Sequence, residues 1–306
     1  MIKILITGGA GFIPSSLAEE LLKKGHYVVL VDNLLTGSME KVPKHANCKF
    51  IKCDTNQYNE IAAIMTSYRF DYVFHYAAVV GVKRTIDNPV MVLKDIDGIR
   101  NVLDLSKNTG VKRIFFSSSS EVYGEPVHLP QHEHTTPLNS KLPYAIVKNV
   151  GEAFCRSYQQ EYGLEYTIFR FFNTYGQKQS TDFVVSKFIQ SALKNEDITI
   201  YGDGKQTRTF CYINDNLEVT LKALENNVFI NEVVNVGNDK LTTINELAET
   251  IIRLTNSGSK IINLSPLKEG DMTRRQPDIT TMLALLGKPL TTLEEGLKIV
   301  IGKLKN

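Results

Sequence analysis

The stretch that decides the fold is residues 2–14, which read IKILITGGAGFIP. A short apolar run leads directly into a glycine-rich turn, and a helical pattern follows. Gly8 and Gly11 allow the backbone to turn sharply and to approach a pyrophosphate group, which then lies at the N-terminus of the helix. The order of strand, glycine turn and helix is the context that this motif requires. The stretch therefore predicts a dinucleotide-binding unit that includes Phe12 and Ile13.

The first half of the chain continues this alternation of strands and helices. Apolar runs of strand length recur, as expected for strands that are buried on both faces. Helical windows at Ser15–Lys24 and Val90–Asn108 lie between them. Such alternation predicts an α/β fold with a Rossmann-type, doubly wound parallel sheet. The predicted strands are Ile2–Thr7, Tyr27–Val31, Cys48–Lys52, Tyr72–Tyr76, Arg113–Ser117 and Tyr166–Phe172.

The second half of the chain lacks the regular alternation of strands and helices. It predicts a smaller, interleaved C-terminal substrate lobe. A loop-like stretch follows Phe172, and the helix at Asp215–Glu225 and the strand at Val233–Gly237 indicate a return to the main sheet. We therefore expect a dinucleotide-binding domain over 1–172, to which 214–237 returns, and a substrate lobe over 173–213 and 238–306. Further elements are expected at Phe183–Lys194, Ile198–Ile200 and Ile244–Thr255, followed by a charged loop at Lys268–Asp278 and two short helices.

Composition excludes several classes of protein. The 306 residues are 42% hydrophobic and 22% charged, which is typical of a globular chain. The net charge of +2 offers no basic stripe for nucleic acid. No apolar run has the length of a membrane helix, and the N-terminus reads directly into a strand without a signal-peptide cleavage site, so we expect a cytoplasmic protein. The four cysteines form no CxxC pair, which predicts reduced, buried thiols.

Asp32 indicates which dinucleotide is bound. It ends the second predicted strand, where a carboxylate accepts hydrogen bonds from the adenosine ribose hydroxyls. The same charge repels a 2′-phosphate, so the sequence favours NAD over NADP. Asp54, at the end of the third strand, is placed to contact adenine. The predicted cofactor-binding residues are Gly8, Gly11, Phe12, Ile13, Asp32, Asn33, Thr36, Gly37, Asp54, Thr55, Ala77, Ala78, Tyr144 and Lys148.

A second motif predicts acid–base chemistry. A run of four serines at 117–120 follows the fifth strand, at the sheet edge where open α/β proteins place ligands. Tyr144 and Lys148 are four residues apart, so they share one face of a helix. A neighbouring ammonium lowers the pKa of a phenol by about 1–3 units. Tyr144 is therefore expected to act as a base on a hydroxyl group, with Ser119 bound to the same oxygen.

Together these motifs resemble the extended short-chain dehydrogenase/reductase family, in its nucleotide-sugar epimerase/dehydratase branch. The resemblance covers essentially the whole chain. Two departures are Pro14 in place of a glycine and Asp95 in place of an asparagine that is common on the helix beneath the cofactor. The similar segments are TGGAGFI at 7–13, DYVFHYAA at 71–78, RFFNTYG at 170–176, YGDGKQTRTFCYIND at 201–215 and RRQPDI at 274–279.

The resemblance implies a reaction and a set of roles. Ser119, Tyr144 and Lys148 match the family's catalytic residues. An NAD that stays bound would oxidise sugar C4 to a ketone and usually be regenerated at the end of the cycle. The partners implied are a nucleotide-sugar, most commonly UDP-linked, and a second copy of the chain, paired through the helices at Val90–Asn108 and Tyr144–Tyr162. The implied substrate-binding residues are Ser119, Ser120, Asn173, Arg208 and Arg275.

Glu121 bears on the fate of the ketone. UDP-glucuronate decarboxylases and 4,6-dehydratases carry Glu at this position, and Ser120-Glu121 with Arg275 is similar to the decarboxylases. The dehydratases have Asp before that Glu, which disfavours dehydration. The segment AAVVGVKR at 77–84 resembles 4-epimerases instead. We therefore expect Glu121 to be catalytic in decarboxylation of a UDP-hexuronate, with a 4-epimerase as the alternative.

The sequence disfavours two further interpretations. A non-catalytic dinucleotide sensor would not need Ser119, Tyr144 and Lys148, so it is disfavoured. His128, His132 and His134 have spacings that suggest a metal, but they lie in a proline-rich loop without a nearby cysteine. No metal site is therefore predicted.

Overall fold

In a computed structural model, residues 1–265 and 275–305 are described, and they form two compact units. Unit 1 comprises Met1–Val122, Ser140–Arg170 and Thr220–Val234. Unit 2 comprises Tyr123–Asn139, Phe171–Val219 and Asn235–Asn306. The sequence predicts residues 123–139 as part of the dinucleotide-binding domain, whereas they group with unit 2 in the structure. Gln131 N, for example, donates to Gln276 O at 2.7 Å, a long-range contact that no local pattern encodes.

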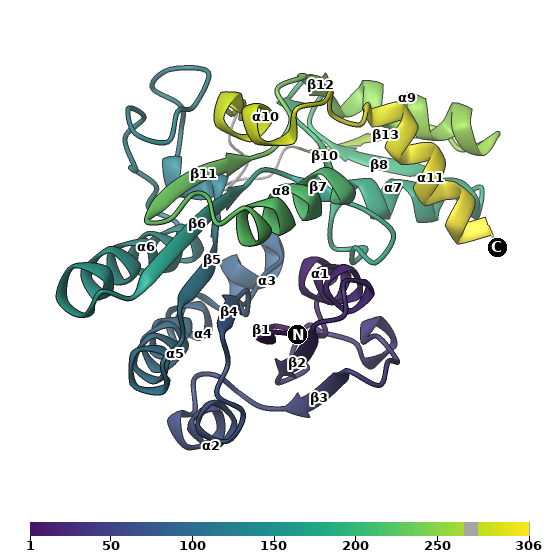
Figure 1. Cartoon of the computed structure of the whole chain (residues 1–306). Coiled ribbons are helices and arrows are strands. Elements are labelled where there is room, and N and C mark those ends of the chain that lie inside the picture. The colour runs from purple at the N-terminus through teal and green to yellow at the C-terminus, as the bar shows by residue number, and fades with distance from the viewer. Residues whose placement is uncertain (266–274, 306) are drawn as a thin grey trace. The chain divides into compact units, whose positions relative to one another are not determined.

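Unit 1 is built on a seven-stranded sheet with the order β11-β6-β5-β4-β1-β2-β3 (Figure 1). The pairs β1–β2, β1–β4, β2–β3 and β4–β5 are parallel. The predicted Rossmann-type sheet is confirmed. Strands β2 and β3 follow on one side of β1 and strands β4, β5 and β6 on the other, so the glycine turn after β1 lies at the point where the strand order switches. The strands are β1 Lys3–Thr7, β2 Tyr27–Asp32, β3 Cys48–Lys52, β4 Tyr72–His75, β5 Arg113–Ser119, β6 Glu165–Phe171 and β11 Glu232–Val236.

Helices cover both faces of this sheet. α2, α5 and α6 lie side by side on one face, and α1 packs on β1 and β2 from the other (Figure 1). The central strands are buried along most of their length, which explains why their sequences are largely apolar rather than alternating. The helices are α1 Phe12–Lys23, α2 Tyr58–Tyr68, α3 Val82–Asp87, α4 Pro89–Leu93, α5 Asp95–Thr109, α6 Pro143–Tyr162 and α8 Ile213–Glu225, the last of which runs from unit 2 into unit 1.

The single helix predicted at Val90–Asn108 is wrong, because the chain forms two helices that meet at Lys94. At this point Asp97 N donates to Lys94 O at 3.0 Å, so the turn is tighter than an α-helical turn. Asp95, the first residue of α5, accepts a hydrogen bond from Val79 N at 2.7 Å. An apolar periodicity that runs through the break concealed it, since both helices bury residues in the same core.

Unit 2 contains short strand pairs and helices. β13 is parallel to β8, β10 is parallel to β7, and β12 is antiparallel to β9. A capping box of Thr243 and Glu246 starts α9, which packs on α7 and α11. The elements are β7 Thr174–Tyr175, β8 Ile198–Tyr201, β9 Thr207–Arg208, β10 Cys211–Tyr212, β12 Thr242–Thr243, β13 Ile261–Leu264, α7 Val184–Leu193, α9 Ile244–Thr255, α10 Thr280–Leu286 and α11 Leu293–Lys305.

Two predictions from composition can be compared with the structure. All four cysteines are unpaired thiols, and three of them are buried as expected, whereas Cys48 is half-buried. Among the described residues, no helix combines the length and the apolar character that a membrane span requires. Part of the predicted loop at Lys268–Asp278, residues 268–274, lies outside the described residues.

Candidate active site

The glycine turn between β1 and α1 has the geometry of an anion-binding turn. Gly8 has a φ of +70°, and a Cβ placed on it would lie 2.9 Å from Cα of Ala77. Gly11 is the N-cap residue of α1 and donates its N–H to Gly8 O at 2.8 Å. Because Gly11 has no side chain, the first-turn N–H groups that include those of Phe12 and Ile13 are not capped by it. These N–H groups suit a pyrophosphate.

Thr7 fixes the loop that lies beside this turn. Its Oγ1 accepts from Tyr76 N and from Ala77 N, each at 3.0 Å, and lies 2.9 Å from His75 Nδ1. Burial, together with the charge of Lys148, lowers the pKa of His75 to about 3, so this ring is neutral. The loop that carries Ala77 and Ala78 is thereby held next to Gly8, as the prediction of a joint cofactor site requires.

Asp32 ends β2 with its carboxylate against the glycine turn. Oδ2 accepts from Ala10 N at 3.0 Å, and Oδ1 accepts from Leu34 N at 2.7 Å. A Cβ on Gly37 would lie 2.9 Å from this carboxylate, so only glycine leaves it room. Burial raises the pKa of Asp32, and the two backbone hydrogen bonds oppose that effect. The side chain is therefore fixed as an acceptor of the kind that a ribose diol needs.

The remaining predicted cofactor residues lie at the ends of β2 and β3. Asn33 and Thr36 are exposed in the loop after β2. Asp54 follows β3 and accepts from Asn56 N at 3.0 Å, and the carbonyl of the buried Thr55 accepts from Asn101 Nδ2, also at 3.0 Å. The glycine turn and the carboxylate of Asp32 together fit NAD.

Lys148 is a buried cation at the carboxyl end of the sheet. It extends from α6, is only 3% exposed, and donates to Ser117 Oγ at 3.2 Å. Its Nζ lies 5.7 Å from the centre of the Tyr144 ring and 5.1 Å from that of Phe116. Burial lowers the pKa of Lys148 to about 8, and the charge of Asp95 opposes this effect. The structure thus brings together Lys148, Tyr144 and the serine run, and Ser117 is a partner that the sequence did not identify.

Ser119 and Glu121 are joined at the end of β5. Ser119 is the last residue of the strand, and its Oγ accepts from Glu121 N at 3.2 Å within the short 3₁₀ turn Ser120–Tyr123. Ser119 and Glu121 are half-buried, whereas Ser120 is 2% exposed. The hydrogen bond joins the backbone of Glu121 to the side chain of Ser119 within one short turn.

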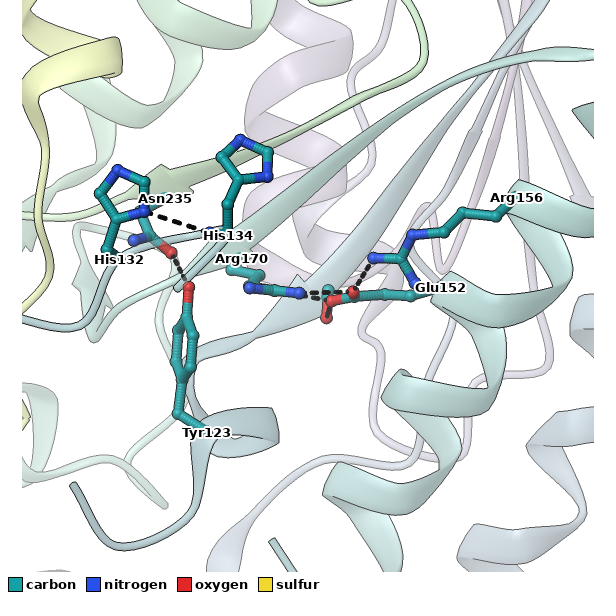
Figure 2. Close-up of polar contacts among 8 residues, drawn as sticks. Tyr123, His132, His134, Glu152, Arg156, Arg170 and Asn235 are labelled. Carbon is teal, nitrogen blue, oxygen red and sulfur yellow. Dashed lines mark hydrogen bonds and ion pairs between the residues drawn. The ribbon is translucent and has the colours of Figure 1, made fainter. Parts of the chain in front are cut away.

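A buried ion-pair cluster supports this edge of the sheet. Glu152, one helical turn after Lys148, accepts from Arg170 Nε at 2.8 Å and Nη2 at 2.7 Å, and from Ser118 Oγ at 2.6 Å (Figure 2). Arg156 adds a contact of 2.8 Å from the exterior. Burial by itself raises the pKa of Glu152, but the bonds to Arg170 and Ser118 outweigh it, and the pKa is lowered overall. The sequence analysis did not single out Glu152. The signal that points to it is its spacing of four residues from Lys148, which puts both side chains on one face of the helix.

The predicted substrate-binding residues of unit 2 lie close to short strands. Asn173 has a φ of +33° and donates from Nδ2 to Thr209 O at 3.0 Å, next to Arg208. Arg208, in β9, donates to Thr207 O at 2.8 Å and is 9% exposed, as is Arg275. Asn173 and the Arg208 strand are therefore neighbours. Arg274, the first residue of the late arginine motif, lies outside the described residues.

His132 and His134 of the proline-rich loop are hydrogen-bonded to each other within unit 2. His134 N donates to His132 Nδ1 at 3.2 Å (Figure 2). Nearby in the sequence, Tyr123 donates its hydroxyl to Asn235 Oδ1 at 2.7 Å, and Asn235 N donates to Glu133 Oε1 at 2.8 Å. Among the described residues, no group of three or more His, Cys, Asp or Glu side chains is arranged to hold a metal ion.

Comparison with known proteins gives a consistent result. The model of the NAD dependent epimerase/dehydratase family matches residues 4–237. The UDP-N-acetyl-alpha-D-glucosaminuronate decarboxylase of Bacillus cytotoxicus is 36% identical, over 98% of this chain and 96% of that protein. UDP-glucuronic acid decarboxylase 1 of Xenopus tropicalis is 37% identical, over 98% and 71% of the two chains.

A solved structure extends the similarity to the whole fold. The UDP-glucose 4-epimerase of Thermotoga maritima, in complex with UDP-glucose, superimposes with a TM-score of 0.94 at 33% identity, over 99% of each chain. The predicted fold, family and cofactor class are confirmed at this level. The chain belongs to the NAD-dependent epimerase/dehydratase family, and it is an enzyme of that family.

Proposed function

We propose that the protein is an NAD-dependent decarboxylase of a UDP-hexuronate. The observation that carries the proposal is the short turn in which Glu121 N donates to Ser119 Oγ at 3.2 Å, since it puts a residue that bears a carboxyl group two positions after the serine of the catalytic set. The two decarboxylases compared above act on UDP-linked uronic acids, as their names state. A 4-epimerase has no need of a carboxyl group at this place.

The residues of α6 and β5 would carry the acid–base chemistry. When bound, NAD would supply the acceptor for the hydride that leaves sugar C4 to give a ketone, and the NADH formed would return that hydride at the end of the cycle. Tyr144 would accept the proton of the C4 hydroxyl, assisted by the charge of Lys148 and a hydrogen bond from Ser119. The ketone makes the C6 carboxylate part of a β-keto acid, so the C5–C6 bond breaks and CO₂ leaves. Glu121 would then control the protonation of C5.

Cofactor and substrate binding are assigned to different residues. Gly8, Gly11, Asp32 and the Ala77–Ala78 loop would hold NAD in unit 1. In unit 2, Asn173, Arg208 and Arg275 would hold the diphosphate or the sugar, because guanidinium groups offer a fixed fork of donors to phosphate oxygens. Ser120 would contribute a substrate contact beside Ser119.

The alternative function is 4-epimerisation of a UDP-sugar. The superposition on a UDP-glucose 4-epimerase at a TM-score of 0.94, together with the segment AAVVGVKR at 77–84, favours it. In that case Tyr144 and Lys148 keep their roles, and Glu121 braces the turn after β5. The homodimer and the cytoplasmic location stay predictions from the sequence.

The test is product analysis with a panel of UDP-sugars. Purified protein is incubated with NAD and UDP-glucuronate, UDP-N-acetylglucosaminuronate, UDP-glucose or UDP-N-acetylglucosamine, and products are identified by mass spectrometry and NMR. A product lighter by one CO₂ is expected from a uronate, with strong loss in Tyr144→Phe and in Glu121→Gln. A product of unchanged mass with inverted C4 would overturn the decarboxylase in favour of the epimerase.

A further inference from the structure

Asn235 is a buried amide in the middle of an apolar strand. It lies in β11, which reads EVVNV, and its side chain is 0% exposed. Burying an amide costs free energy unless its polar atoms are hydrogen-bonded. Oδ1 accepts from the hydroxyl of Tyr123 at 2.7 Å (Figure 2), and the backbone N donates to Glu133 Oε1 at 2.8 Å. Nδ2 donates to Gln131 O at 2.9 Å and to Asp278 O at 3.2 Å, so this one side chain joins three stretches of unit 2.

The stretch that contains Asp278 is held at each of its residues. Gln131 N donates to Gln276 O at 2.7 Å, and Asp278 N donates to Gln131 O at 2.8 Å. Between these two bonds, Pro277 forms a parallel bridge with Gln131. A Cβ placed on Gly237, two residues after Asn235, would lie 2.9 Å from Pro277 Cγ, so this proline packs directly on the end of β11. Residues 276–278 are therefore fixed to β11 and to the loop around Gln131.

Arg275 directly precedes this fixed stretch. Its side chain is 9% exposed, and we assign to it a contact with the diphosphate or the sugar. A guanidinium binds an anionic group through a fork of donors, so its position has to be correct to about 0.5 Å. The backbone beside Arg275 is held at Gln276 by Gln131, and Gln131 is in turn held by Asn235. Asn235 thus acts on Arg275 through backbone hydrogen bonds.

Tyr123 brings a second part of the site to the same amide. It is the last residue of the 3₁₀ turn Ser120–Tyr123 and lies two residues after Glu121. Its ring is 0% exposed and lies 6.1 Å from the ring of Phe172. The hydroxyl that donates to Asn235 therefore also fixes the end of the turn that carries Glu121.

We propose that Asn235 is a positioning residue of the substrate site, which holds Arg275 in place by tying residues 276–278 to β11. The hydrogen bonds of its side chain with Tyr123, Gln131 and Asp278 are called the Asn235 frame. Asn235 does not contact the substrate itself, because it is buried and both polar atoms of its side chain are bonded within the frame. The inference rests on the proposed function in one respect, the contact of Arg275 with the nucleotide-sugar.

The test measures the Kd of UDP-glucuronate by calorimetry with NAD present. All variants carry Tyr144→Phe, so that turnover does not disturb the binding isotherm. The frame is removed by combining Tyr123→Phe with Asn235→Leu. This pair of substitutions replaces both partners of the short hydrogen bond by apolar groups of similar shape, which limits the loss of stability. Arg275→Met is then introduced with and without the frame.

Two controls separate positioning from general loosening of unit 2. Arg208→Met is measured in the same two backgrounds, because the backbone of Arg208 is held by its pairing with Thr242 rather than by Asn235. Tyr175→Phe replaces the frame substitutions in a matched background. It removes another buried hydroxyl of unit 2, which donates to Leu293 O at 3.3 Å.

With the frame intact, Arg275→Met and Arg208→Met should each weaken binding by about tenfold or more, as expected for a charged hydrogen bond. Without the frame, Arg208→Met should keep its effect, whereas Arg275→Met should change the Kd by less than about twofold, since the two changes then act on one interaction. In Tyr175→Phe both arginine effects should stay at full size.

An Arg275→Met effect of equal size with and without the frame overturns the inference. So does a parallel decrease of both arginine effects, or an Arg275→Met protein that binds as tightly as its parent. Should the protein without the frame fail to fold, Asn235→Asp takes its place, because it keeps an acceptor for Tyr123 and removes the donor to Asp278 O. Binding is measured without turnover, so a wrong choice between decarboxylation and epimerisation would appear only in the product masses.

Discussion

Two buried cations in unit 1, Arg170 and Lys148, differ in how their charges are compensated. Arg170 is 1% exposed and makes two hydrogen bonds to Glu152, whose carboxylate also accepts from Ser118. Lys148 is 3% exposed and has the hydroxyl of Ser117 as its hydrogen-bond partner, with Asp95 acting at a distance. The first cation is neutralised by direct contact, whereas the second is left short of charge compensation.

The difference separates a structural charge from a functional one. A bidentate arginine–carboxylate pair fixes both charges and locks geometry. Glu152 lies one helical turn after Lys148, so the pair with Arg170 ties α6 to β6, while Ser118 ties it to β5. Lys148, by contrast, has a pKa near 8, close to the pH at which it would work. The rigid pair holds the frame in which the titratable lysine acts.

The largest expected effect comes from Lys148→Met, which removes the poorly compensated cation. Activity should fall by about a thousandfold, because Tyr144 loses the charge that favours its phenolate. Stability at neutral pH should rise by about 1–3 kcal/mol, since a buried charge with a lowered pKa destabilises the folded state. Urea denaturation and product assays at matched pH measure both effects.

The pH dependence of that stability provides a sharper comparison. The folded pKa of about 8 lies below the ordinary value of 10.5, so the unfolded chain binds more protons between these values. Lys148 should therefore make the free energy of unfolding of the wild type increase as the pH rises from 8 to 10.5. This increase should be absent in Lys148→Met. The exposed Lys52→Met is the control. An identical slope in wild type and Lys148→Met would show that the lysine is compensated after all.

Breaking the other cation's partner should have the opposite effect on stability. Glu152→Gln keeps the shape of the side chain and leaves Arg170 buried without its counter-charge, at a cost of about 3–5 kcal/mol. Because the pKa of Glu152 is lowered in the folded state, its contribution is present above its ordinary value of 4.5 and is lost as the pH falls. The loss should be measured in urea at pH 7.

Glu161→Gln, at an exposed position of the same helix, is the matched control for that experiment. It should change the free energy of unfolding by less than about 0.5 kcal/mol. A loss below about 1 kcal/mol in Glu152→Gln would mean that water or another group compensates Arg170, and the contrast between the two cations would then disappear.

Much of this contrast was accessible from the sequence. The spacing of Tyr144 and Lys148 predicted a shared helix face, because helical geometry is local and periodic. The glycine turn and Asp32 were likewise identified, since a phosphate-binding turn needs particular residues in a fixed order. All of these are short-range patterns, and the structure places each one at the carboxyl edge of the parallel sheet, as expected.

The partners of the charges were not accessible, since they are long-range. Glu152 meets Arg170 only after α6 packs on the sheet, and nothing in either local sequence specifies the other. The helix break before Asp95 was missed because the apolar period continues through it. The residue after the break, Asp95, accepts a hydrogen bond from Val79 N, a contact between a loop and a helix that depends on the assembled core.

Tyr123 and Asn235 form a buried hydrogen bond between neutral side chains. It tests whether charge is the reason that substitutions in the Glu152 cluster lower the free energy of unfolding. Tyr123→Phe removes the hydroxyl that donates to Asn235 Oδ1 at 2.7 Å (Figure 2). The expected loss is about 1–3 kcal/mol, since a buried acceptor is left without its donor. Thermal and urea unfolding measure it, with the exposed Tyr201→Phe as the control. A loss as large as that of Glu152→Gln would mean that burial, rather than charge, sets the cost.

The smallest expected effect is at the exposed end of the same cluster. Arg156 contacts Glu152 at 2.8 Å, but its side chain is 43% exposed, so water screens the interaction. Arg156→Met keeps the aliphatic stem and should cost less than about 1 kcal/mol. Urea denaturation of Arg156→Met, Glu152→Gln and the double variant gives the coupling energy directly. If Arg156→Met lowers the free energy of unfolding as much as Glu152→Gln does, then Arg156 is the main counter-charge of Glu152. The two short bonds from Arg170 to Glu152 would then not be what stabilises the cluster.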